Sequence, residues 1–262
     1  MIGFLSDFGH ADPYVGICHG VITRFAPGER IVDICHEVPR GDVRTGAAML
    51  AQSVPYLPSG VYLAVVDPGV GTDRRGVVVA AGDSIFVGPD NGLLMWAADA
   101  LGGPAAAHEI TNHHLMITPV SYTFHGRDVF SPVAARLATG VPPSGVGPEV
   151  SVDELSRLPD PAVQVDADGL HVEVLSIDRY GNLQTAGTAA QLRSALSLRS
   201  TGEPLLVGAV KATYGETFGS VALGEMVVFE DSAGLIAVAV NGGDARALLG
   251  AEPGSLLRFR RA

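Results

Sequence analysis

Residues 61–75 read VYLAVVDPGVGTDRR. The first six are apolar and include three valines, which is typical of a short buried strand. Asp67, Pro68 and Gly69 end that strand abruptly, because Pro has no N–H for the strand ladder and Gly accepts unusual backbone angles. Open α/β sheets bind ligands at the carboxyl ends of their strands. We therefore expect Asp67, with the two arginines that follow it, to face a small ligand.

Strands and helices alternate before this stretch. We expect two strands and two helices there, at residues 2–5, 13–25, 30–34 and 42–56, with Asp12 and Asp42 as helix N-caps. This alternation implies a parallel sheet. Asp7 follows the first strand as Asp67 follows the third, so both carboxylates are expected at one edge of the sheet. Asp7 taken alone is explained equally well as a turn residue that bonds to its own backbone.

After Arg75 the pattern predicts a β-hairpin, with strands at 76–81 and 84–87. The absence of a helix here argues against two glycine-rich alternatives. The first motif of S-adenosylmethionine methyltransferases and the dinucleotide-binding fingerprint both lead from the strand directly into a helix. In addition, Asp73 stands where the third glycine would be needed. The loop therefore belongs to another kind of site.

The segment YTFHGRD at 122–128 predicts a helix that is capped by Asp128 and runs to about residue 138. His125 then lies just before a helix N-terminus, where the helix dipole favours a neutral imidazole able to accept a proton. The other candidate histidines are His36 and the pair His113-His114. They lack partners at metal-ligand spacing, so we interpret them as structural or loop residues and expect no metal site.

The second half of the chain is rich in β-strands. A stretch rich in Pro and Gly suggests a linker, which gives an α/β domain at 1–140, a linker at 141–162 and a β-rich domain at 163–262. The last domain is expected to be a small barrel or sandwich with loops of interest at 178–182 and 231–234. Its expected strands are 163–165, 170–177, 205–210, 225–229, 235–240 and 256–259.

Composition limits the partners of the chain. Its 262 residues carry 17 Lys and Arg against 28 Asp and Glu, a net charge of −11, and no basic run, so nucleic acid is a poor candidate. Two cysteines, Cys18 and Cys35, form no disulfide framework. The start of the chain lacks a signal-peptide pattern and no apolar run approaches membrane-spanning length. We therefore expect a cytoplasmic protein that acts away from membranes.

Five motifs together resemble one family. They are LSDFG at 5–9, VDPGVGT at 66–72, GPDNG at 88–92, FHGRD at 124–128 and DRYGN at 178–182. In this order and over nearly the whole chain, they are similar to the adenosine-forming S-adenosyl-L-methionine hydrolases, relatives of the fluorinase and chlorinase enzymes. The resemblance implies an N-terminal α/β domain with a mainly parallel sheet and a smaller C-terminal β-barrel-like domain.

The resemblance also implies a homotrimer that binds S-adenosylmethionine between the N-terminal domain of one subunit and the C-terminal domain of its neighbour. It assigns catalysis to Asp67, Arg74 and His125, and disfavours Arg75. It further implies six substrate-binding residues: Asp7 on the ribose, Phe124 against the nucleoside, Asp178 and Asn182 on the amino acid, Ser232 near adenine, and Tyr180 as a wall of the site. Without the family, DRYGN reads only as a hairpin turn.

The chemistry agrees with these residue types. The sulfonium already makes methionine a good leaving group, so the enzyme must supply a positioned, deprotonated water for attack at C5′. His125 can accept that proton, Arg74 can stabilise hydroxide, and Asp67 can orient water or ribose. The sequence leaves open which group takes the proton. No metal or cofactor is required, because the leaving group needs no Lewis acid.

Two alternatives stay open. One is halide-dependent 5′-halogenation of S-adenosylmethionine. In the halogenating relatives Tyr replaces the Asp67 position, the His125 position is not His, and hydroxyl residues stand where this chain has Val70 and Gly126, so hydrolysis is preferred. The other alternative is a nucleoside-binding module without turnover, which would keep the pocket but would not need Asp67, Arg74 and His125 together.

Overall fold

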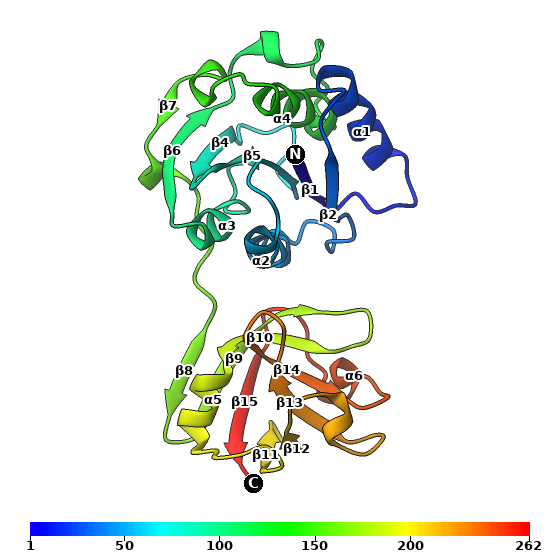
Figure 1. Cartoon of the computed structure of the whole chain (residues 1–262), viewed down its shortest axis with the longest axis vertical. Helices are drawn as coiled ribbons and strands as arrows, with labels where there is room; N and C mark the ends of the chain where they lie inside the picture. The colour runs from blue at the N-terminus through cyan, green and yellow to red at the C-terminus, as the bar shows by residue number, and fades with distance from the viewer. The chain divides into compact units, whose positions relative to one another are not determined.

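The computed structural model describes residues 1–262, which form two compact units, Met1–Leu158 and Pro159–Ala262 (Figure 1). The boundary falls within the stretch that the sequence suggested as a linker. Most of that stretch belongs to the first unit, because β7 (Glu149–Val150) pairs with β6 (Pro104–Glu109) at the edge of the first sheet.

The first unit is built on a seven-stranded sheet in the order β2-β1-β3-β5-β4-β6-β7. Strands β2, β1, β3 and β5 pair with one another in parallel, whereas β4 pairs antiparallel with β5 and β6, and β6 pairs antiparallel with β7. This arrangement confirms the predicted α/β class and the hairpin after Arg75. The other strand bounds are β1 (Ile2–Ser6), β2 (Ile31–Cys35), β3 (Val61–Val65), β4 (Gly76–Ala81) and β5 (Ser84–Pro89).

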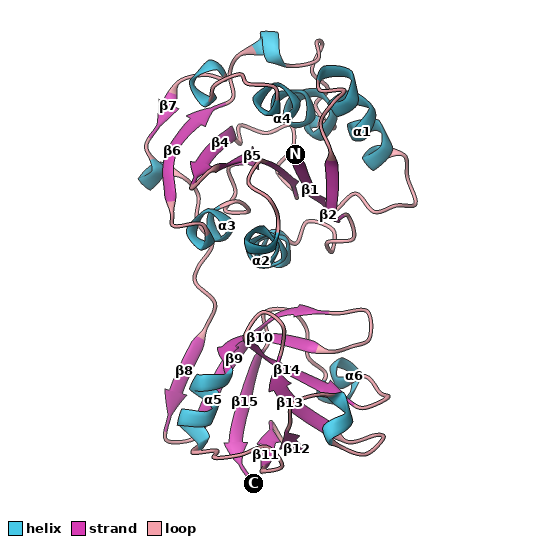
Figure 2. Ribbon diagram, viewed as in Figure 1, coloured by secondary structure: helices cyan, strands magenta, loops and turns pink.

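Helices cover both faces of this sheet (Figure 2). They are α1 (Tyr14–Phe25) and α4 (Ser131–Ala138) on one face, and α2 (Val43–Ser53) and α3 (Met95–Ala100) on the other. Side chains alternate along each strand, so Phe4 packs into the core under α1 and α4 while Leu5 packs under α2 and α3. Both faces of the central strands are therefore buried, which explains their continuous apolar sequence.

Three aspartates were predicted as helix N-caps, and the structure confirms one of them. Asp42 accepts a hydrogen bond from the Thr45 amide at 2.9 Å and caps α2 as predicted. The prediction for Asp12 was wrong, because Pro13 is the N-cap residue of α1 and no side chain caps it. The prediction for Asp128 was also wrong. It lies inside a single π-helical turn, η3 (Gly126–Phe130), that precedes α4, and it is fully buried.

The second unit is a closed barrel of seven strands in the order β9-β10-β14-β13-β12-β11-β15, with β8 added outside β9. This confirms the expected β-barrel-like domain. Strand β10 was not predicted. The single strand predicted at 205–210 is interrupted by a turn at Gly208, which separates β11 from β12. The bounds are β8 (Val163–Asp166), β9 (Gly169–Ile177), β10 (Leu183–Thr188), β11 (Pro204–Val207), β12 (Val210–Tyr214), β13 (Met226–Glu230), β14 (Leu235–Val240) and β15 (Leu256–Arg261).

The remaining helical segments are short. In the second unit α5 (Ala189–Leu196) packs its apolar side chains into the barrel core, and α6 (Ala245–Leu249) follows β14. Single 3-10 turns occur at Val54–Tyr56, His113–Leu115, Pro143–Gly145, Val152–Glu154 and Phe218–Ser220. None of the helices in the structure has the length and apolar character needed to cross a membrane.

Close packing at β5 gives a stability prediction. A Cβ at Gly88 would lie 2.3 Å from the Ala64 carbonyl oxygen of β3, so Gly88→Ala forces the two strands apart. We expect a loss of about 1–3 kcal/mol in the free energy of unfolding, measured by urea unfolding. Gly16→Ala in α1 is the control, because no atom lies within 4 Å of its added Cβ. It should stabilise the helix by up to about 1 kcal/mol. Equal effects of the two substitutions would contradict this account.

Candidate active site

The end of β3 carries a carboxylate that is held by two hydrogen bonds from one guanidinium. Arg74 Nε donates to Asp67 Oδ1 at 3.0 Å and Arg74 Nη2 donates to Asp67 Oδ2 at 2.5 Å. The side chains of Arg74 and Asp67 are only 10% and 6% exposed. Arg74 Nη1 also donates to the Arg75 carbonyl at 3.1 Å, and the guanidinium lies 5.3 Å from the centre of the Phe130 ring. The pair is therefore fixed on several sides.

His125 joins this pair from a loop 51 residues away in sequence. Arg74 Nη2 lies 3.1 Å from His125 Nδ1. Guanidinium has donors and no acceptor, so this contact assigns the lone pair to Nδ1 and the proton to Nε2. The structure thus brings the three residues predicted for catalysis into one connected group.

Two packing features hold the His125 loop against the Asp67 loop. Asp128 accepts hydrogen bonds from the Ser121 amide at 2.9 Å and from Arg127 Nε at 2.7 Å, which anchors the loop that precedes η3. Gly71, at a φ of +79°, approaches the other loop so closely that a Cβ there would lie 2.4 Å from the Tyr122 carbonyl oxygen. The glycine is required by both its backbone angle and its surroundings.

Burial and charge set the protonation of the site. Burial and the adjacent Arg74 charge lower the pKa of His125 from its ordinary value of 6.5, so the imidazole is neutral at neutral pH. Burial raises the pKa of Asp67 above its ordinary value, although Arg74 opposes this effect. Asp67 is thus more basic than an ordinary aspartate, and His125 is a neutral hydrogen-bond acceptor. A basic carboxylate beside a neutral imidazole and a cation can bind a water molecule and accept a proton from it.

Arg75 serves a different purpose from Arg74. Its Nε and Nη2 donate to Asp90 Oδ2 at 3.0 and 2.6 Å, and Nη2 also donates to the Glu154 carbonyl at 3.0 Å. Asn91 in the same GPDNG turn donates to the Val66 carbonyl at 2.9 Å. The GPDNG turn is therefore bonded to the end of β3, and the hydrogen bonds of Arg75 are made to structural groups and not to Asp67.

Asp7 lies at the same edge of the sheet as Asp67. Ser6 and Val65 are directly paired across β1 and β3, so Asp7 and Asp67 follow neighbouring strand ends. Asp7 Oδ2 accepts a hydrogen bond from the Gly41 amide at 2.8 Å. A Cβ on Gly41 would in turn lie 3.8 Å from Pro68 Cβ, which shows that the three loops adjoin.

Phe124 belongs to an aromatic cluster that the sequence analysis did not predict. Its ring makes edge contacts with Phe8 and Tyr14, at centroid distances of 5.9 and 5.2 Å. Phe8 belongs to the LSDFG motif and Tyr14 is the first residue of α1. The sequence feature that could have indicated the cluster is therefore this pair of aromatic residues on either side of Asp12-Pro13. The cluster gives the strand-end region an apolar wall beside its polar group.

The remaining predicted site residues lie in the second unit. Asp178, Tyr180 and Asn182 form the turn between β9 and β10, in which Asp178 Oδ1 accepts from the amides of Tyr180 and Asn182 at 2.8 and 3.0 Å. Asn182 Nδ2 also donates to Asp178 Oδ2 at 2.8 Å. The hairpin turn expected without the family is therefore present, and Tyr180 is 62% exposed.

Ser232 lies in the turn between β13 and β14. Its neighbour Asp231 accepts hydrogen bonds from the amides of Ala233 and Leu235 at 2.8 and 3.0 Å. Asp231 also accepts from Gln184 Nε2 at 2.5 Å, and Gln184 is the second residue of β10. This bond connects the Ser232 turn with the strand that begins at the Asn182 turn.

The histidines interpreted as structural differ from one another. His113 and His114 are exposed in their 3-10 turn, and the His114 amide bonds to Asn112. His36 is buried and lies in a cluster with His19 and Asp33 that the sequence analysis did not predict. The cluster draws on a helix, a strand and a loop, so no regular spacing marks it.

Family models cover most of the chain. Residues 2–147 match the N-terminal domain of the SAM hydroxide adenosyltransferases, where SAM is S-adenosylmethionine, and residues 172–258 match their C-terminal domain. The chain belongs to this family. A Salinispora tropica protein named (R)-S-adenosyl-L-methionine hydrolase is 54% identical over 98% of this chain and 96% of its own. A Thermus thermophilus protein of the same name is 44% identical over 98% of each chain.

More distant relatives and solved structures agree with this membership. A protein from an Actinoplanes species named fluorinase is 29% identical over 92% of this chain and 91% of its own. The crystal structure of an uncharacterized conserved protein from Thermotoga maritima superposes with a TM-score of 0.91 at 36% identity, over 100% of both chains. The fold of this SAM hydroxide adenosyltransferase family member is therefore the fold of its relatives.

The contact between Arg74 and His125 predicts the pKa of one histidine. In Arg74→Gln the loss of the cation should raise the pKa of His125, because Arg74 disfavours the imidazolium and Asp67 favours it. A histidine NMR titration measures the shift. Arg75→Gln is the matched control, since it removes the same charge one residue away and should leave His125 unchanged. A His125 pKa that moves equally in both variants would show that the contact with Arg74 has no special weight.

Proposed function

We propose that this protein hydrolyses S-adenosyl-L-methionine to adenosine and L-methionine by attack of an activated water or hydroxide at ribose C5′. The observation that carries the proposal is the connected group of Asp67, Arg74 and His125. The hydrolase names of relatives at 44–54% identity over nearly the full chain support it. The protein is accordingly proposed to be an enzyme of the hydrolase class.

Each member of the group has a distinct task in this mechanism. Arg74 is a cation that cannot lose its proton, so it stabilises negative charge as water becomes hydroxide. Asp67 holds the guanidinium in place by two hydrogen bonds and offers its remaining lone pairs to water or ribose. His125 accepts from Arg74 and so fixes the other side of the guanidinium. Methionine leaves without further help, because its sulfur bears the positive charge.

The hydrogen bonds favour one of two candidates, Asp67 and His125, for the base that takes the proton from water. His125 Nδ1 already accepts from Arg74, so His125 takes a proton there only if that bond breaks. Asp67 keeps free lone pairs, and its raised pKa makes it a better base than an ordinary aspartate. We propose Asp67 as the first acceptor and His125 as the group that keeps Arg74 oriented. The sequence had left open which group takes the proton, and this proposal makes that choice.

The binding roles follow the same proposal. Asp7 at the adjoining strand end is proposed to bind the ribose hydroxyls, and Phe124 with its aromatic neighbours to contact the nucleoside. In the second unit, the turn residues are proposed to bind the rest of the substrate. These are Asp178 and Asn182 for the amino-acid portion, Tyr180 as a wall, and Ser232 near adenine.

Halogenation is the less favoured alternative. A Cβ on Gly126 would lie 2.8 Å from Phe8 Cζ, so the packing opposes a hydroxyl side chain at that position. Asp67 and His125 likewise belong to the water-using set. A nucleoside-binding module without turnover would have no need to keep a buried Asp67–Arg74 pair linked to a neutral histidine.

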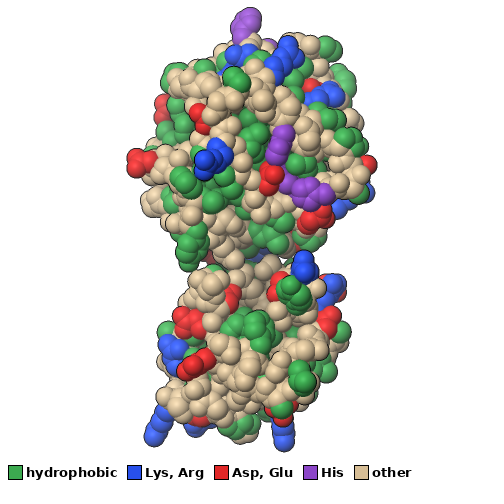
Figure 3. Space-filling model, turned by 45° about the vertical axis from the view of Figure 1, so that its right-hand side comes forward, with side chains coloured by type: hydrophobic (Ala, Val, Ile, Leu, Met, Phe, Trp, Pro, Cys, Tyr) green, Lys and Arg blue, Asp and Glu red, His purple; other side chains and the backbone are tan.

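The assembly and location are proposed from the resemblance. We infer a cytoplasmic homotrimer with its active sites at subunit interfaces, without a metal or cofactor in the reaction. Lys and Arg side chains are scattered on the face shown in Figure 3, in keeping with a small-molecule substrate and not a nucleic acid.

Incubation with S-adenosylmethionine in ¹⁸O-water tests the reaction. We expect ¹⁸O-labelled adenosine independent of added chloride, because water oxygen attacks C5′. The relatives' name specifies the (R) form, so each sulfonium epimer is supplied separately. Asp67→Asn removes the proposed base and should lower the rate by about 10²- to 10⁴-fold. Arg74→Gln should lower it by about 10²- to 10³-fold, and His125→Ala by about 10²-fold, because Arg74 then loses its orientation.

The control for these variants is His113→Ala, which alters an exposed histidine away from the group and should retain full activity. Halogenated nucleoside as the product would move the protein to the halogenating branch. Tight binding of either epimer without any product would support the binding module and overturn the proposed hydrolysis.

The lowered pKa of His125 predicts the acid side of the pH profile. Protonated His125 cannot accept from Arg74 and repels it, so kcat/KM should be level near neutral pH and fall with a midpoint below 6.5. Steady-state rates across this range measure it. In Arg74→Gln the midpoint of the His125 step should move upward. In His125→Gln that step should be absent, which leaves only the fall in rate that protonation of Asp67 causes. A wild-type midpoint at or above 6.5 would contradict the assigned environment.

A further inference from the structure

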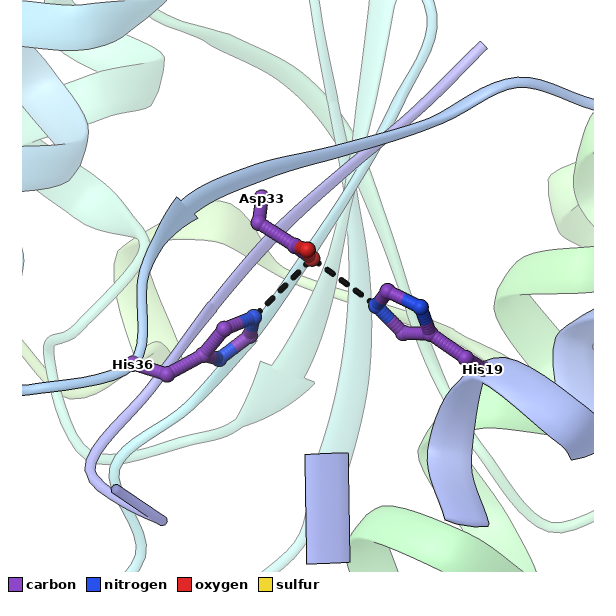
Figure 4. Close-up of side chains that lie close together, drawn as sticks. All are labelled: His19, Asp33 and His36. Carbon is purple, nitrogen blue, oxygen red and sulfur yellow. Dashed lines mark hydrogen bonds and ion pairs between the residues drawn. The ribbon is translucent and has the colours of Figure 1, made fainter. Parts of the chain in front are cut away.

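Three side chains that could bind a metal ion converge beside β1, apart from the group at Asp67. Figure 4 shows the rings of His19 and His36 directed at one carboxylate, that of Asp33. The distances to Asp33 Oδ1 are 2.8 Å from His19 Nε2 and 2.9 Å from His36 Nε2. One ligand atom from each residue lies within 4.8 Å of both others. The residues come from α1, the middle of β2 and the loop after it.

Two imidazoles and one carboxylate are a ligand set typical of zinc. Tetrahedral zinc at about 2.0–2.2 Å from each ligand separates neighbouring ligand atoms by about 3.3 Å. The observed hydrogen bonds are shorter than this by about half an ångström, so small side-chain rotations open the space for an ion. Three protein ligands would leave the fourth position to water.

The surroundings of His36 are built to orient a ligand. The fully buried Ser6 hydroxyl lies 2.7 Å from His36 Nδ1, and Phe4 packs edge-on beneath the ring at 4.5 Å. A hydroxyl donates or accepts by rotation, so Ser6 serves both tautomers. Without an ion it donates to Nδ1 while Nε2–H bonds to Asp33. With an ion it accepts from Nδ1–H and leaves the Nε2 lone pair free, as outer-shell partners of metal-bound histidines do.

The exposure of the three residues allows an ion to enter. His36 is fully buried, whereas the side chains of His19 and Asp33 are 32% and 43% exposed. The ring of His10 lies 5.4 Å from that of His36 and adds a further imidazole at the rim. Figure 3 shows histidine and acidic side chains next to one another on one face of the first unit. The cluster thus has one buried ligand, His36, and two ligands that solvent can reach, His19 and Asp33.

We propose that His19, Asp33 and His36 form a binding site for one divalent zinc-type ion, distinct from the catalytic group. The ion would join α1 to β2. It would also fix the loop after β1, because the Gly9 amide donates to the His36 carbonyl at 2.7 Å and Asp7 lies in that loop. This replaces the interpretation of His36 as a purely structural histidine. The reaction proposed above requires no ion at this place.

The test uses the full chain without a polyhistidine tag, treated with a chelator and dialysed. Isothermal titration with Zn²⁺ should give one site per chain, and Zn²⁺ should raise the thermal unfolding temperature. His19→Ala and Asp33→Asn alter exposed or half-buried side chains and should fold, but they should lose both effects. The double variant His113→Ala and His114→Ala is the matched control, because it removes two exposed histidines outside the cluster and should bind like the wild type.

A second variant addresses the outer shell. Ser6→Ala should weaken Zn²⁺ binding by about 10- to 100-fold, the usual effect of removing the partner of a ligand histidine. Circular dichroism checks that each variant is folded. Absence of stoichiometric Zn²⁺ binding to the wild type, or binding that His19→Ala and Asp33→Asn leave intact, would overturn the proposal and leave a hydrogen-bonded cluster.

Discussion

The paired hydrogen bonds between Arg74 and Asp67 are the constraint on which the rest of the site depends. Both side chains are nearly buried, so each charge is tolerated only because the other is present. Removal of one partner from such a pair typically costs about 3–5 kcal/mol, since an uncompensated charge remains. The pair also fixes the guanidinium for His125. A single interaction therefore couples the loop after β3 to the loop before η3.

The sheet supplies the position of that interaction. Parallel pairing of β1 with β3 in the register Ser6 to Val65 places two carboxylates at adjoining strand ends. The antiparallel hairpin that follows then returns Arg75 to Asp90, which braces the same loop from the scaffold side.

Sequence predicted what local patterns determine. Apolar runs marked the central strands, Asp42 marked its helix, and five ordered motifs marked the family and the two-part fold. The prediction that Asp128 caps a helix was wrong because its carboxylate accepts from the backbone amide of Ser121, which precedes it, and because it lies in a π-helical turn, which no capping rule anticipates. Strand β10 has no apolar run, because Leu183 is its only large apolar residue and its buried Thr185 donates a hydrogen bond to the Ile236 carbonyl. His19, Asp33 and His36 meet only through the packing of α1 on β2, so their spacing carries no signal.

The surroundings of two histidines in the first unit, His36 and His125, differ in the charge that each ring faces. His125 faces the cation of Arg74, which keeps the ring neutral and makes the nearby space favourable for a developing hydroxide. His36 faces the carboxylate of Asp33, which makes the nearby space favourable for a cation. Under the two proposals, the same type of side chain serves anion stabilisation after β3 and cation binding at β2, on the two sides of β1. Because β1 lies between β2 and β3, the loop after β1 adjoins both neighbouring loops. The Gly9 amide donates to the His36 carbonyl, and Asp7 accepts from the amide of Gly41, which lies next to Pro68.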